Sequence, residues 1–534
     1  FRSLLYFFSK RLDKKYNKQT IAAKMTDVPG HTRSIIDPMY DAGIRLLHVG
    51  INSACPLPSV PTFCRWRSPS GNDLLLVYQK DYGEDEVLPD GKTVVSINFT
   101  GDNHGPHSYE RVKKIYADLR KRYPQAQLVG ASFNDVAREL LLIKKDLPVV
   151  TSEIGDTWIF GYGGAPIRMA KFRAVSRLYS QWLNEGKIKK DSDVALDFAA
   201  ELGLIAEHTQ GVDVKTHLRQ WDKYDMDKFL KGRSEGVFSM AEASWKEIDN
   251  YIDSAIAFLP ASLQKEAREV VAEVDKVKLE DNSKMKPMAR KRWEQPIAGG
   301  MTLAGLSYQM FDGDDYDDFQ NRYLRARYGW ALDDLGKRGL KESHAVSVTL
   351  YAQTMAQSVR KEKKGTRIIT ELRFPENEKV DKRVYPERIQ VNCFTTKNGK
   401  RSEVALTIYG KPAVRLPESY WLSFTVPGIE SVIAEKMGER VNLMDVVEKG
   451  NRQMHGIDRY VDLITSGETI RISSKEAFLL NVGEAQGLNY STNYPDKRKG
   501  VHFNLNNNLW GTNFSMWNEG SLTYHFVIET LSRK

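Results

Sequence analysis

The 534-residue chain lacks the features that mark several protein classes. It has three cysteines and no C-x-x-C pair, which excludes a zinc site built from paired thiolates. No run of about 18 apolar residues occurs, so no membrane-spanning helix is expected. No dense lysine and arginine run is interleaved with aromatic residues, so the net charge of +9 does not predict a nucleic-acid partner. Cys55 and Cys64 flank a proline-rich loop and fit one disulfide or two free thiols equally.

The length of the chain predicts two to four domains, because a single core stops growing well below this size. Hydrophobic residues (41%) and charged residues (28%) are in ordinary globular proportion. The amphipathic start lacks the apolar core and cleavage site of a signal peptide and resembles a segment entered midway. A periplasmic or secreted location is expected if a preceding segment carries a signal peptide. The sequence predicts no oligomeric state.

The first part of the chain alternates between strand-like and helix-like segments. Strands are expected at residues 21–25, 44–51, 74–78, 93–99, 127–131 and 148–151. Helices are expected at residues 33–42, 112–119, 134–142 and 166–183. This recurrence predicts an α/β domain over residues 1–185, built on a parallel sheet or barrel.

The remaining sequence predicts two further domains. Helical periodicity dominates residues 186–290 and predicts a helical bundle, with residues 281–291 as a polar linker. Residues 291–534 are rich in alternating, β-branched segments and predict an antiparallel β-sandwich domain or domains, with a helix over residues 312–335. The clearest of these strands are residues 367–374, 389–394, 405–409, 469–472 and 522–528.

Four loops are rich in reactive side chains. They are Thr26–Thr32, Thr100–Ser108, Thr151–Ile159 and Ala206–Asp213. The first three follow expected strands, where parallel α/β domains place their functional groups. Taken singly, each loop is better explained as a turn or a helix cap, and a lone histidine is more often structural than a ligand.

Taken together, the loops favour chemistry on a sugar. Two carboxylates from neighbouring strand ends are the requirement for glycoside hydrolysis. A carboxylate with a neutral imidazole also suits zinc or another divalent metal. The tryptophan beside Asp156 is a candidate platform for a sugar ring, because an apolar ring face packs against sugar C–H groups.

The sequence Lys24–Thr32, KMTDVPGHT, resembles the Asp-Pro-Phe-Gly-His-Ser loop of glycoside hydrolase family 38, the metal-dependent α-mannosidases. The resemblance implies that Asp27 is both a metal ligand and the catalytic nucleophile. Gly101–Pro106 is similar, with one residue deleted, to the family's loop that supplies the acid/base, which implies that role for Asp102. Glu207–Val212 resembles a family segment that gives a zinc-binding histidine, which implies that role for His208.

The resemblance is closer still to a bacterial branch whose function is uncharacterised, through TDVPGHT, SEIGDTW, EHT-x-GVD and a terminal NN-x-WGTNF segment. It implies a barrel-like catalytic domain of seven or eight strands, incomplete at its N-terminal end, followed by a helical bundle and β domains. The family's early His-x-Asp pair, which gives two further zinc ligands, does not precede Asp27 here. Asp27 and His208 alone would bind zinc weakly.

These observations predict a retaining, metal-dependent glycosidase that acts on α-mannosides or related glycans. The expected substrate contacts are His31, Asn52, Asp156 and Trp158. The side chains expected to orient the metal ligands are Glu153, Glu207 and Asp213. A metal-dependent polysaccharide deacetylase and a non-catalytic carbohydrate-binding relative are the alternatives.

Overall fold

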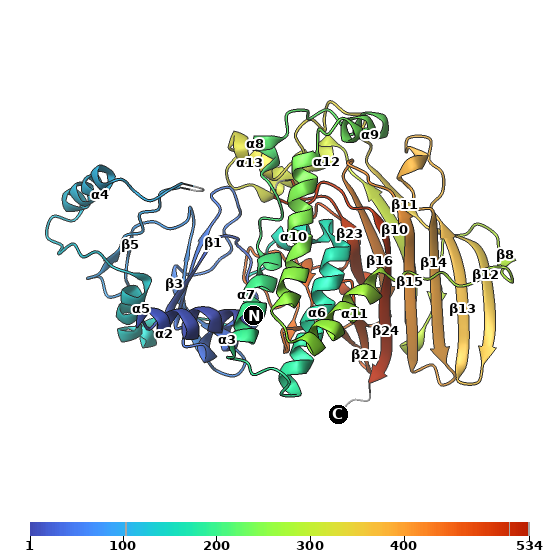
Figure 1. The fold of residues 1–534 in the computed structure, drawn as a ribbon, viewed down its shortest axis with the longest axis horizontal. Helices are drawn as coiled ribbons and strands as arrows, with labels where there is room; N and C mark the ends of the chain where they lie inside the picture. Colours follow the sequence, from blue (N-terminus) through green and yellow to red (C-terminus); the bar gives the residue numbers. More distant parts are fainter. Residues whose placement is uncertain (102–103, 512, 532–534) are drawn as a thin grey trace.

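The computed structural model describes residues 1–101, 104–511 and 513–531. It has a mixed α/β architecture with three parts that lie side by side in Figure 1. An α/β sheet lies at one end, a group of helices lies in the middle, and two large antiparallel sheets form the other end. Among these residues, no helix is both long and apolar enough to cross a membrane.

The α/β part is an open, mixed sheet of five strands in the order β1-β2-β4-β3-β7. Its strands are β1 (Ala22–Asp27), β2 (Leu46–Ile51), β3 (Phe63–Arg67), β4 (Asp73–Gln79) and β7 (Val149–Val150). The helices of this part are α1 (Arg2–Tyr6), α2 (Asp13–Tyr16), α3 (Ile36–Asp41), α4 (Tyr109–Arg122) and α5 (Phe133–Leu142). β1, β2 and β4 are parallel neighbours, whereas β3 runs antiparallel to β4. A closed barrel of seven or eight strands is therefore not confirmed.

Two of the expected strands are wrong. Residues 93–99 form only the short β6 (Val94–Val95), which pairs with β5 (Glu86–Val87) as a separate hairpin. Residues 127–131 form no strand, and Val129 is 70% exposed. A strand of a parallel sheet has both faces covered, and this segment has no such cover.

The helices in the middle share one core. They are α6 (Pro166–Asn184), α7 (Asp193–Gly203), α10 (Ser239–Ala257) and α11 (Ala261–Asp275). The smaller helices α8 (Val214–His217) and α9 (Met226–Ser234) pack on a second cluster around Trp517. Because Val175 and Trp182 are fully buried in the shared core, α6 packs as a member of this helical group.

The third part consists of two antiparallel sheets. The first has the order β11-β10-β16-β23-β22-β19, with β9 added to β10. Its strands are β9 (Gln295–Pro296), β10 (Thr302–Met310), β11 (Val348–Tyr351), β16 (Glu418–Thr425), β19 (Met454–Gly456), β22 (Leu479–Val482) and β23 (Val501–Asn507).

The second sheet has ten strands in the order β18-β17-β20-β21-β24-β15-β14-β13-β12-β8. Its strands are β8 (Lys286–Pro287), β12 (Gln353–Glu362), β13 (Gly365–Arg373), β14 (Arg388–Thr396), β15 (Arg401–Lys411), β17 (Ser431–Lys436), β18 (Glu439–Asn442), β20 (Tyr460–Ile464), β21 (Thr469–Ser474) and β24 (Gly520–Leu531). Phe424 and Phe503 of the first sheet pack on Phe526 of the second, which joins the two sheets in one core.

The helix expected over residues 312–335 is two helices, α12 (Gly313–Tyr323) and α13 (Gly329–Asp334). The expected linker contributes β8 to the edge of the ten-stranded sheet. Cys55, Cys64 and Cys393 are buried free thiols, so the Cys55–Cys64 disulfide does not form.

Candidate functional site

Asp27 is the last residue of β1, at the carboxyl end of the parallel strands. Its backbone has φ +89°, in the left-handed region that residues other than glycine rarely adopt. The backbone is held there because its carbonyl accepts a 2.8 Å hydrogen bond from the amide of Asn52, the residue after β2. Strain of this kind gathers at functional sites, since the surrounding structure must stabilise it.

One carboxylate oxygen of Asp27 is fixed by two neutral donors. Asn52 Nδ2 and Tyr82 Oη each donate to Asp27 Oδ1 at 2.9 Å. Gly50 on β2 makes this possible, because a Cβ there would lie 2.5 Å from the backbone of Tyr82. The sequence analysis does not predict Tyr82, although this residue lies just beyond the end of β4.

His208 meets the other oxygen of Asp27 from the helical part of the molecule. His208 Nε2 lies 3.2 Å from Asp27 Oδ2, and Nδ1 lies 2.8 Å from Glu207 Oε1. The loop is held by the buried Gln210, whose amide donates to the carbonyls of Ile205 and Glu207. The structure thus brings Asp27, Asn52, His208 and Glu207 together.

The carboxylates of Asp27 and Glu207 stabilise the charged form of His208. Burial alone would lower the pKa of His208, but the hydrogen bonds to the Asp27 and Glu207 carboxylates raise it to about 10. Burial would raise the pKa of Glu207, and the hydrogen bonds from His208 and from the Thr209 amide hold it below its usual range. His208 is therefore an imidazolium at neutral pH, clamped between two carboxylates.

Asp156 and Trp158 lie behind His208. The Trp158 ring centroid is 5.8 Å from that of His208, and the side chain is 9% exposed. Asp156 Oδ2 accepts a 2.9 Å hydrogen bond from the Trp158 amide, and both its oxygens accept from Tyr323 Oη. Burial raises the pKa of Asp156 to about 6, against the lowering effect of these hydrogen bonds. Tyr323 is a second partner that the sequence reasoning missed.

Two other predicted residues, Glu153 and Asp213, make their hydrogen bonds elsewhere. Glu153 accepts hydrogen bonds from Thr32 and the Arg33 amide and pairs with Lys436 at 2.7 Å, which ties the first loop to the β-sandwich. Asp213 caps α8 through the Lys215 amide. Neither contact reaches Asp27 or His208.

His31 is the remaining predicted contact. Its amide and carbonyl pair with Ile154, so the first and third loops are hydrogen-bonded to each other. Burial lowers the pKa of His31 to about 4, despite a hydrogen bond to the Val28 backbone. Its Nε2 is buried and has no hydrogen-bond partner among the described residues.

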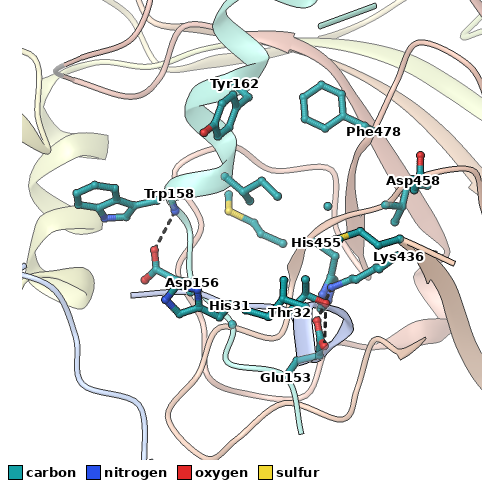
Figure 2. Close-up of a pocket in the computed structure, with 18 of the residues that line it drawn as sticks. His31, Thr32, Glu153, Asp156, Trp158, Tyr162, Lys436, His455, Asp458 and Phe478 are labelled. Atoms are coloured by element: carbon teal, nitrogen blue, oxygen red, sulfur yellow. Dashed lines mark hydrogen bonds and ion pairs between the residues drawn. The ribbon is translucent and has the colours of Figure 1, made fainter. Parts of the chain in front are cut away.

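A cavity of about 510 Å³ opens beside these groups. Figure 2 shows His31, Asp156 and Trp158 on one side of it and Lys436, His455 and Asp458 on the other. His208 lines the cavity as well. The cavity therefore lies where the α/β sheet, the helices and the β-sandwich meet.

Asp102 lies outside the described residues, so its predicted acid/base role stays a prediction. A zinc site needs several His, Cys, Asp or Glu side chains close together. Within residues 1–101, 104–511 and 513–531, no three His, Cys, Asp or Glu side chains gather as a metal site. Asp27 and His208 supply two donors, and a catalytic zinc takes three protein ligands with one open position. The described residues therefore do not form a complete zinc site.

Comparisons with known proteins define the class of this fold. An α-mannosidase from Enterococcus faecalis V583 is similar over 99% of this chain and 76% of that chain, with a TM-score of 0.52 and 10% identity. A glycosyl hydrolase family 38 protein from Enterococcus faecalis matches over 99% and 75%, with a TM-score of 0.43 and 10% identity. The likeness to the Enterococcus faecalis V583 α-mannosidase shows that the chain has a glycoside hydrolase-like multidomain fold.

The comparisons of sequence match only part of the chain. A family model described as a domain of unknown function (DUF5054) matches residues 163–295, the segment that contains the four long helices. No curated protein sequence matches the chain. The likeness to α-mannosidases is therefore one of fold.

Proposed function

We propose that this protein is a retaining glycosidase that hydrolyses α-mannosides or related glycans, with Asp27 as the nucleophile. The observation that carries the proposal is the setting of Asp27. It stands at a strand end in a strained conformation, with Oδ1 fixed by two donors and Oδ2 facing His208. The α-mannosidase-like fold supports the choice of substrate class.

The geometry suggests how the chain's own residues act. Asn52 and Tyr82 hold the carboxylate plane by binding Oδ1, which leaves Oδ2 as the attacking oxygen. His208 keeps Oδ2 oriented until the anomeric carbon of the sugar takes its place. Attack forms a glycosyl ester on Asp27 and releases the aglycone, which must receive a proton from a general acid. Water then hydrolyses the ester, and the sugar keeps its anomeric configuration.

The first test follows the hydrolysis of an aryl α-mannoside by proton NMR. We expect the α-anomer to appear first. Asp27→Asn should reduce the rate at least about a thousandfold, because it removes the nucleophile. Asp90→Asn is the matched control, since Asp90 lies in an exposed turn and accepts hydrogen bonds from the neighbouring residues Lys92 and Thr93. A β-anomer as the first product, or full activity in Asp27→Asn, would contradict the assignment.

The same experiment separates the alternatives. A deacetylase would release acetate from an acetylated glycan and leave the glycosidic bond intact. A binding relative would retain the mannoside without turnover. Free sugar in the product spectrum excludes both.

The proposed acid/base role of Asp102 has its own test. Asp102→Asn should slow hydrolysis of an alkyl α-mannoside about a hundredfold or more, because a poor leaving group needs the proton. Hydrolysis of a dinitrophenyl α-mannoside should change little in its bond-cleaving step, since that leaving group departs as an anion. Equal losses on both substrates would contradict the role.

A further inference from the structure

The cavity beside His208 is lined mainly by apolar side chains. Its volume of about 510 Å³ falls within the usual range for a small-molecule site. The lining comes from the loops of the α/β sheet that carry His31 and Asp156, the loop of His208, the turn η4 (Trp158–Gly164), helix α6, and the strands and loops of the β-sandwich. The main apolar lining residues are Ile159, Phe172, Met454, Ile457, Phe478 and Phe514.

Several of the polar side chains of this lining are engaged within the protein. The guanidinium of Arg173 donates to the carbonyls of Ile457, Asp458, Ser474 and Lys475. Lys436 and Glu153 pair with each other.

Neutral polar groups around the cavity are also hydrogen-bonded to other groups of the protein. Tyr162 Oη donates to the carbonyl of Ala206, and Ser180 Oγ donates to that of Ser176 on the same helix. His455 Nε2 is bonded to the Arg452 carbonyl. A sugar ring in this space would lose hydrogen bonds to water and find few in return, and that loss opposes binding.

One end of the cavity lies next to His208, which contacts the proposed nucleophile. His208 and Trp158 both line the cavity, and His208 Nε2 is 3.2 Å from Asp27 Oδ2. Asp27 itself is not part of the lining, so a sugar placed on Asp27 would lie beside the apolar space and not inside it. His31 Nε2, buried without a partner among the described residues, gives this end an acceptor for a hydroxyl group.

We propose that this cavity holds the apolar aglycone of the substrate, so that the enzyme acts on glycosides of alkyl or aryl alcohols. The inference rests on the proposed function, because the aglycone is defined by cleavage at Asp27. It differs from a glycan-chain site, which would present unpaired polar groups to successive sugars. The apolar lining and the engaged polar groups are what favour an apolar occupant.

The test compares binding of methyl and octyl α-D-mannopyranoside by titration calorimetry, with the hydrolysis-deficient Asp27→Asn protein. Each added CH₂ should tighten binding about three- to fourfold while it remains inside the cavity. We therefore expect the octyl glycoside to bind at least about tenfold more tightly than the methyl glycoside. 1-Octanol, a probe without a sugar, should bind to the same cavity.

Ser180→Phe should abolish the octyl preference and the octanol binding, because the new ring fills the cavity from α6. Gln181→Phe is the matched control, since Gln181 is the next residue of the helix and faces solvent. Ser176→Phe, on the same lining, repeats the block one turn away, and thermal unfolding shows whether each variant is folded.

Two results would overturn the inference. One is equal binding of the methyl and octyl glycosides together with no octanol binding. The other is an octyl preference that survives in folded Ser180→Phe and Ser176→Phe. Octanol binding that Ser180→Phe removes, in a protein that cleaves no mannoside, supports the apolar site and contradicts the proposed function instead.

Discussion

Asp27 combines features that a purely structural aspartate does not need. A residue that only caps the following helix would require neither the left-handed backbone nor two neutral donors on one oxygen. Thr32, not Asp27, is the residue that caps that helical turn, by accepting from the Ser34 amide. The cap interpretation of Asp27 therefore fails, and the strained, oriented carboxylate is the better description.

Tyr82 provides a test of this orientation. Tyr82→Phe removes one hydrogen bond of 2.9 Å to Asp27 Oδ1 and keeps the ring. A hydrogen bond to a charged group contributes about 1.5–3 kcal/mol, so we expect hydrolysis of the aryl α-mannoside to fall about ten- to a hundredfold. Tyr16→Phe, on an exposed tyrosine, is the control for assay and expression. An unchanged rate in Tyr82→Phe would show that this donor does not matter to the reaction.

Tyr323 tests the support behind Trp158. Tyr323→Phe takes the hydroxyl away from the buried Asp156 and leaves the Trp158 amide as its donor. Because an underpaired buried carboxylate is costly, the free energy of unfolding should fall by about 1–3 kcal/mol. Urea denaturation measures this, with Tyr328→Phe, an exposed tyrosine, as control. Equal stability of the two variants would contradict the account of Asp156.

Among the elements, α6 is the one that connects the parts of the molecule. Its inner face packs in the helical core, and Arg173 donates to four carbonyl groups of the β-sandwich. Burial lowers the pKa of Arg173 to about 10, so it remains a cation at neutral pH. The helix thereby fixes one wall of the cavity against the sandwich.

Arg173→Lys should disconnect α6 from the sandwich. A lysine cannot satisfy several carbonyl groups at once, so we expect a loss on the order of 3–5 kcal/mol in the free energy of unfolding. Arg177→Lys is the matched control one turn further along, where a single hydrogen bond to the Lys475 carbonyl is at stake. Thermal and urea unfolding compare them. A loss in Arg177→Lys as large as that in Arg173→Lys would contradict the connecting role.

The elements also show what the sequence could predict. Strands β2 and β4 are mainly apolar runs, and β13, β14, β15 and β24 alternate in polarity, so their patterns predict them well. Residues 127–131 have the same apolar texture, but whether such a run pairs depends on neighbours that are distant in the chain. The position of β3 between β4 and β7, and hence the open sheet, follows from long-range pairing that local pattern does not contain.

The sequence likewise predicts some residues of the site and not others. Asp27, Asn52 and His208 carry recognisable local patterns, and the structure brings them together. Tyr82 and Tyr323 reach the site through side-chain hydrogen bonds from a turn and from a helix after residue 300. A tyrosine has many ordinary uses in a core, so its type and position alone do not predict these contacts.

At the scale of the whole molecule, buried neutral histidines should lower the free energy of unfolding as the pH falls. Burial lowers the pKa of four histidines to about 4 or, for one of them, to about 3: His31, His48, His502 and His455. Between pH 6.5 and 4 the unfolded chain binds these protons and the folded chain does not, so stability falls as pH falls. Asp156 and Asp334, whose pKa values are raised to about 6 by burial, act in the opposite direction. Glu418, Glu435 and Glu439 act in that direction as well, because burial also raises their pKa values.

We expect the four histidines to outweigh these carboxyl groups, so the melting temperature should decrease from pH 7 to pH 5. The four histidine protons correspond to about 5 kcal/mol per pH unit as an upper limit, which the carboxyl groups reduce. Scanning fluorimetry at constant ionic strength measures it. His455→Gln should reduce the slope, because one buried imidazole no longer titrates in the unfolded chain. A melting temperature that stays constant or rises toward pH 5 would contradict this balance.

The most direct measurement of the proposed chemistry is to trap the glycosyl ester. The protein is incubated with a fluorinated α-mannosyl fluoride, whose ester with a carboxylate hydrolyses slowly, and its peptides are analysed by mass spectrometry. The account predicts one fluorosugar on the peptide that contains Asp27 and none in Asp27→Asn. A label on another carboxylate, or hydrolysis of aryl α-mannosides by a protein that forms no ester, would contradict it.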